Sequence, residues 1–108
     1  MNYTPSQITT LKPSIITSIS PSDMNNWNYT QIEAINIDHI RALSPDHISM
    51  IQSGAFNKLK HECVEIMTIE QTQAISPDAI ANMVPKQITA LSPQQLNSLT
   101  VHQLNKCS

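Results

Sequence analysis

The spacing of the prolines constrains the fold of this chain more than any other feature. Successive prolines are separated by 8, 8, 24, 32, 8 and 8 residues, so every spacing is a multiple of eight. A fixed period of this kind indicates tandem repeats. When the chain is divided into octapeptides from Thr4, 13 units fill residues 4–107 without an insertion. We number the residues of each unit from position 1 to position 8, so that proline, where present, occupies position 2.

Two positions of the unit carry the apolar residues. Position 8 is apolar in every unit, and position 5 is apolar in every unit except the ninth, where it is Thr72. Apolar residues at every third position lie along one side of a helical turn, whereas a strand would place them at every second position. The pattern therefore predicts one short helix per unit, with positions 5 and 8 in the core. Trp27, Ile88 and Leu91 are among the expected core residues.

The first four positions carry the signals of a helix start. Position 1 is usually Ser, Thr or Asn, which cap free amides, and proline at position 2 suits the first helical residue. Position 4 is most often Gln, which completes a capping box. Such short helices are unstable alone, and one continuous helix would rotate the apolar side by about 80° per unit. We therefore predict an all-α solenoid, or superhelix, of about thirteen short helices in one domain over residues 1–108.

The pattern weakens in the seventh and eighth units, residues 52–67. They lack proline and contain the only glycine and the only phenylalanine of the chain. Their apolar residues follow helical spacing, which predicts that the two units merge into one longer helix capped by Ser53. The apolar residues of that expected helix are Phe56, Leu59, Cys63 and Met67.

The same segment is the predicted partner-binding surface. Residues that depart from the consensus of a repeat array are free to serve recognition. Charged side chains here can select a protein partner by complementarity. The candidates are Phe56, Lys58, Lys60, Glu62 and Glu65. The alternative is that these charges only solvate the outer side of the longer helix.

Composition excludes several classes of function. The formal net charge is −2, from 6 Lys and Arg against 8 Asp and Glu, so we expect no nucleic-acid partner. Residues 1–20 contain neither a signal-peptide core nor a spanning segment, so we expect no membrane insertion. Two cysteines without a C-x-x-C motif favour reduced thiols, in the cytoplasm or after export without an N-terminal Sec signal.

No arrangement of catalytic residues is recognisable. A single glycine excludes a glycine-rich phosphate loop. His61 and Cys63 lie two residues apart, which on a helix points them to different faces. We therefore expect neither an enzyme nor a cofactor.

A metal site is the sharper alternative. His39, His47 and Cys63 share position 4, and His61 lies close to Cys63 in sequence. A spiral of three units per turn would stack His39 on Cys63, because they are 24 residues apart. Against this, position 4 is the capping-box position, and ligand pairs with typical zinc spacing are missing. We predict no metal, and keep a metal-binding or metal-stabilised module as the alternative function.

The units SPQQLNSL, VPKQITAL and SPDAIANM resemble short proline-marked helical repeats that occur in tandem in some bacterial secreted, surface or effector-type proteins. The resemblance covers residues 4–107. It implies an interaction or structural role and no catalytic residues. We therefore predict a non-enzymatic scaffold for protein–protein interaction or self-assembly, with a spacer fragment of a longer array as another alternative.

The ends of the predicted array suggest self-association. Solenoids normally close with polar capping units, but here consensus units extend almost to both ends of the sequence. Apolar side chains on the two end faces should attract one another and give a homo-oligomer. The residues expected there are Ile8, Leu11, Leu99 and Leu104.

Overall fold

The protein is described by a computed structural model that covers residues 3–107, with side chains placed as far as residue 105. This part of the chain contains thirteen short helices and no strand, which confirms the all-α class. The helices are α1 (Pro5–Thr9), α2 (Pro13–Ile16), α3 (Pro21–Met24), α4 (Tyr29–Glu33), α5 (Ile37–Ala42), α6 (Pro45–Ser49), α7 (Ser53–Phe56), α8 (His61–Glu65), α9 (Ile69–Ala74), α10 (Pro77–Ala81), α11 (Pro85–Ala90), α12 (Pro93–Ser98) and α13 (Val101–Cys107).

Each helix begins at position 2 of one octapeptide, as the proline spacing predicts. In the twelfth unit, Ser92 at position 1 has extended backbone angles of −72° and 162°, and Pro93 is the first helical residue. Proline disfavours the α conformation in the residue before it, so the chain bends at position 1. The side-chain oxygen of Ser92 accepts a hydrogen bond from the amide of Gln95 at 3.1 Å. This bond satisfies one of the amides that a helix start leaves free.

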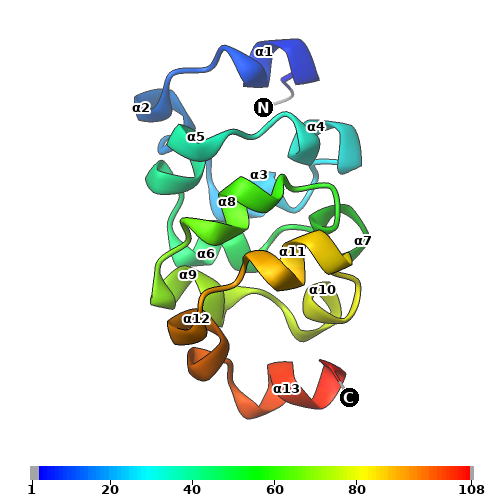
Figure 1. Cartoon of the computed structure of the whole chain (residues 1–108). Helices are drawn as coiled ribbons and strands as arrows, with labels where there is room; N and C mark the ends of the chain where they lie inside the picture. Colours follow the sequence, from blue (N-terminus) through cyan, green and yellow to red (C-terminus); the bar gives the residue numbers. More distant parts are fainter. Residues whose placement is uncertain (1–2, 108) are drawn as a thin grey trace.

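The helices stack in layers of three. Each of α1 to α10 packs against the third helix after it, so that α1 contacts α4 and α10 contacts α13. Figure 1 shows the chain passing from α1 at one end of the molecule to α13 at the other. The molecule measures 36 × 22 × 21 Å and has a radius of gyration of 12.8 Å. A compact domain of this length has a radius of about 13 Å.

Positions 5 and 8 form one continuous core along the stack. Position 5 is buried in the first ten units, from Ile8 to Ile80, and Trp27 and Leu91 at position 8 are buried as predicted. Thr72 is the polar exception at position 5. Its hydroxyl donates to the carbonyl of Thr68 at 2.9 Å and accepts from Gln95 Nε2 at 3.3 Å, so the buried oxygen is satisfied.

Position 5 is not buried in the last layer. The exposed fraction is 38% for Ile88, 44% for Leu96 and 49% for Leu104. The prediction that Ile88 belongs to the core was therefore wrong. The cause is the direction of stacking, because the position 5 side chain is covered by the layer that follows, and no described layer follows α11, α12 and α13.

Units seven and eight remain separate helices, so the predicted merger was wrong. α7 ends at Phe56 and α8 begins at His61, and Lys60 between them is extended, with φ −59° and ψ 141°. Gln52 precedes α7, so Ser53 is its first residue and not its cap. A continuous helix would rotate the apolar side away from the core, whereas a bend every eight residues returns it there.

Candidate functional site

The side chain at position 4 links each layer to the layer before it. Gln95 shows both halves of the contact. Its Oε1 accepts from the amide of Ser92 at 2.7 Å, which completes the capping box. Its Nε2 donates to the carbonyls of Val64 at 2.9 Å and Met67 at 3.0 Å. These acceptors occupy positions 5 and 8 of a unit one layer earlier.

The same bridge recurs along the stack. Gln71, Gln87 and Gln103 each donate through Nε2 to carbonyls 31 and 28 residues earlier, at 2.7 to 2.9 Å. Position 4 is buried in every unit from Gln31 to Gln103. The capping-box reading of this position was thus incomplete, because it assigned the amide only to its own helix. The missed signal is the amide itself, which has donors left over after its oxygen has capped the helix.

Two histidines take the place of glutamine in this bridge. The Nδ1 of His39 accepts from the amide of Asn36 at 3.2 Å, and its Nε2 lies 2.6 Å from the carbonyl of Leu11. A carbonyl only accepts, so Nε2 must carry the hydrogen. His47 bridges Ser44 and the carbonyl of Ile19 in the same way. Both ring nitrogens of each histidine are therefore committed to hydrogen bonds.

Cys63 also occupies the bridging position, and its chemistry is that of a buried thiol. Its Sγ donates to the carbonyl of Ile35 at 3.6 Å. Desolvation by burial raises its pKa to about 11, partly offset by the charge of Lys60. At neutral pH the side chain is a protonated thiol, which is neither a nucleophile nor a metal ligand.

The four residues considered for a metal do not form a site. His61 is exposed and pairs with Glu62 at 2.9 Å, away from the buried bridging positions. Within residues 3–105, no three His, Cys, Asp or Glu side chains are grouped so that they could hold a metal ion. The metal alternative built on His39, His47, His61 and Cys63 thus receives no support from the geometry.

The predicted partner-binding surface on segment 52–67 is only partly available. Phe56 is fully buried and cannot contact a partner. The Nζ of Lys60 donates to the carbonyls of Glu33 at 2.8 Å and Ile35 at 3.0 Å, so this side chain joins two layers. Lys58, Glu62 and Glu65 are exposed, and their role in recognition stays a prediction.

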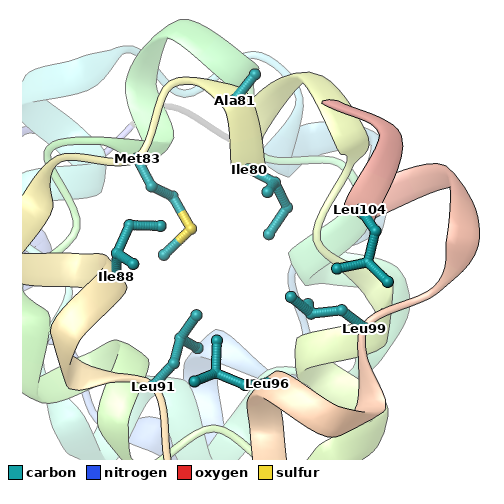
Figure 2. Close-up of a pocket in the computed structure, with 8 residues that line it drawn as sticks. All are labelled: Ile80, Ala81, Met83, Ile88, Leu91, Leu96, Leu99 and Leu104. Carbon is teal, nitrogen blue, oxygen red and sulfur yellow. The ribbon is translucent and has the colours of Figure 1, made fainter. Parts of the chain in front are cut away.

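The C-terminal end of the stack carries an apolar depression. Figure 2 shows side chains such as Met83, Leu91 and Leu104 pointing into a common hollow. The volume of this hollow is about 460 Å³. We call this the C-terminal end surface, and its residues are Ile80, Ala81, Met83, Ile88, Leu91, Leu96, Leu99 and Leu104. It includes Leu99 and Leu104, the two apolar residues predicted for this end.

The opposite end is lined by more polar residue types. A smaller hollow of about 330 Å³ is lined by Tyr3, Gln7, Thr10, Leu11, Lys12 and Ile15, which we call the N-terminal end surface. Leu11 lies there as predicted, but Ile8 is fully buried and does not. Position 4 is exposed here at Gln7 and Ile15, because the described chain has no layer beneath them.

Comparison with known proteins found no match to this chain. No protein-family model matches the chain, and no curated protein or solved structure matches it significantly. None of the helices in the described part of the chain is long and apolar enough to cross a membrane.

Proposed function

We propose that the chain is a solenoid of octapeptide units that serves as a non-enzymatic scaffold for protein–protein interaction and self-assembly. The packing of each helix on the third helix after it supports this architecture, because a constant offset adds layers along one axis. The resemblance of the units to tandem repeats of bacterial secreted, surface or effector-type proteins agrees with it.

The observation that carries the proposed function is the C-terminal end surface. Ile88, Leu96 and Leu104 are exposed there, although the same position is buried in every earlier unit. A contiguous apolar surface on a soluble protein marks a site of interaction. The surface is concave and aliphatic, and burying it removes apolar area from water, which is the main driving force for protein association.

Sedimentation velocity of the 108-residue chain over a wide concentration range tests the proposal. We expect the average mass to rise with concentration, and Leu104→Glu to shift the transition to higher concentration by placing a charge in the hollow. Ile69→Glu is the matched control, because Ile69 is also an exposed apolar residue but lies on α9, outside both end surfaces. A monomer at every concentration, or equal effects of the two substitutions, would overturn the assembly role of this surface.

A further inference from the structure

We propose that the N-terminal end surface of one copy docks on the C-terminal end surface of a second copy, head to tail. This inference rests on the proposed assembly function and adds the polarity and chemistry of the contact. The predicted contact repeats the interface between layers within one chain. In that arrangement α1, α2 and α3 of the second copy lie over α11, α12 and α13 of the first, because every helix packs on the third helix before it.

The two end surfaces are the two halves of one interface. Inside the stack, position 4 side chains of one layer meet position 5 and position 8 carbonyls of the layer before. Position 4 is buried wherever a layer lies beneath it and exposed at Gln7 and Ile15. Position 5 is buried wherever a layer lies above it and exposed at Ile88, Leu96 and Leu104. The N-terminal end therefore exposes position 4 side chains that have no earlier layer to meet, and the C-terminal end exposes position 5 side chains that have no later layer to cover them.

The N-terminal end surface holds donors that match those used inside the stack. Gln7 already caps its own helix, since its Oε1 accepts from the amide of Thr4 at 2.8 Å. Its Nε2 has no acceptor among the described residues, whereas the Nε2 of Gln31 donates to a carbonyl 28 residues earlier. Lys12 occupies position 1, as does Lys60, whose Nζ donates to two carbonyls of the earlier layer.

The C-terminal end surface holds the acceptors. At position 8, the carbonyls of Leu59, Met67 and Ile75 each receive a side-chain donor from the following layer. No side chain in the described part of the chain donates to the equivalent carbonyls of Met83 and Leu91. Ile15 takes the position of a bridging glutamine without its amide, and its exposed aliphatic side chain suits the aliphatic hollow.

Hydrogen bonding favours this polarity over the contact of two C-terminal end surfaces. Two such surfaces would bring carbonyls together without donors, and a buried carbonyl without a donor is costly. Head-to-tail contact supplies a donor side chain from Gln7 and Lys12. Because the contact joins two different surfaces, it closes into rings or extends into filaments.

Mixing two blocked variants tests the polarity. The head variant carries Lys12→Glu and Ile15→Glu, and the tail variant carries Leu96→Glu and Leu104→Glu, all at exposed side chains. We expect each variant alone to be monomeric, because its two surfaces can no longer pair. In an equimolar mixture, the intact tail of one meets the intact head of the other, so light scattering should give a dimer that does not grow. A chain with Arg41→Glu and Ile69→Glu, at exposed side chains outside both end surfaces, should assemble like the wild type.

The outcomes separate this inference from the proposed function. If the head variant dimerises alone and mixing adds nothing, association occurs through two C-terminal end surfaces and the head-to-tail polarity is wrong, while assembly stands. If the wild type is monomeric throughout, both fail. Circular dichroism checks that each variant is folded, and a second pair with alanine at the same four positions repeats the mixing test without added charge. Failure of both mixtures to give a dimer while the wild type assembles also overturns the polarity.

Discussion

At the scale of single residues, glutamine suits position 4 because one planar amide carries an acceptor oxygen and two N–H donors. In Gln87 the oxygen accepts from the amide of Val84 at 3.1 Å, and the nitrogen donates to the carbonyls of Phe56 and Leu59 at 2.8 and 2.9 Å. Histidine offers one acceptor and one donor, and cysteine offers one weak donor. Alanine, which occupies position 4 as Ala55 and Ala79, offers neither, so these two units lack the bridge.

Replacing Gln95 by alanine should lower the free energy of unfolding by about 2–4 kcal/mol, because two buried carbonyls and one amide lose their partner. Gln94→Ala is the matched control. It removes the same side chain from an exposed position of the same helix and should change stability by less than about 0.5 kcal/mol. Urea unfolding of both variants measures the difference. Similar losses would show that the bridge contributes little.

Cys63 should resist thiol reagents while the protein is folded. Burial raises its pKa from 9.0 to about 11, so little thiolate exists near pH 8. In a Cys107→Ser background, we expect slow reaction with an aromatic disulfide in buffer and fast reaction in denaturant. Equal rates under the two conditions would contradict the burial of Cys63.

The raised pKa of Cys63 also makes the free energy of unfolding depend on pH. The unfolded thiol ionises first, so the stability it contributes is complete below about pH 9 and is lost as the pH rises towards about 11. Other groups titrate in the same window. The measurable quantity is therefore the difference in pH dependence between the Cys107→Ser chain and the same chain with Cys63→Ser added.

At the scale of elements, the bends between consecutive helices contribute more to the order of the layers than the helices themselves do. Each helix has only 4 to 7 residues and gains little stability by itself. In the units of Ala55 and Cys63, position 1 supplies part of the contact between layers. Gln52 donates to the carbonyl of Asn25 at 2.7 Å in the unit of Ala55. In the unit of Cys63, Lys60 donates to the carbonyls of Glu33 and Ile35. Helix starts thus carry both the caps and the contacts that order the layers.

His61→Pro should stabilise the protein by about 0.5–1 kcal/mol. His61 is the first residue of α8, and Lys60 before it is already extended, so proline fits the native backbone and restricts the unfolded chain. Thermal unfolding should show a small rise in Tm. Glu65→Pro, near the end of the same helix, should cost about 3 kcal/mol or more. A large loss for His61→Pro would indicate a helix continuous through this bend.

Local signals predicted the helices well. Ser92, Pro93 and Gln95 specify a helix start through residue types alone, and the period places positions 5 and 8 on one side. The merger of α7 and α8 was mispredicted because Gln52 and Lys60 are not capping residues, although the tertiary contacts of their side chains hold the bend. A local pattern contains no information about such contacts.

The candidate site was predicted less well, for a geometric reason. The period does not reveal that position 4 faces the earlier layer and position 5 the later one. The two ends therefore looked alike in sequence, and Ile8 was assigned to a surface although the second layer covers it. Leu99 of the twelfth unit and Leu104 of the thirteenth were placed correctly, because no described layer follows either of them. Assigning the faces requires the direction in which the layers stack.

At the scale of the whole molecule, the register of eight residues holds the layers together. The core is a single cluster from Ile8 to Leu91, and its continuity depends on each unit offering positions 5 and 8 to the same interior. Shifting one unit by a single residue turns its apolar side chains by about 100° around the helix. Shifting by a whole unit leaves the apolar pattern in place.

Deleting Ser92 should therefore damage the protein more than deleting all of residues 84–91. Without Ser92, α12 and α13 lose their register, and residues after Leu91 should become sensitive to protease. Without residues 84–91, Gln95 takes the place of Gln87 over the carbonyls of Phe56 and Leu59, so the stack is shorter but intact. Limited proteolysis with mass spectrometry distinguishes the two. Equal resistance of both variants would show that register does not govern stacking.

The bridges between layers end on main-chain carbonyls, and this has a consequence for how such an array can change in evolution. A carbonyl is present at every residue, whatever its side chain, so the acceptor for Gln71, Gln87 or Gln103 exists before any particular neighbour is selected. A duplicated unit with glutamine at position 4 brings its own donor and needs no matching substitution elsewhere. Polar contacts between layers should then leave no paired changes in related sequences, and arrays of different length can arise by gain or loss of whole octapeptides.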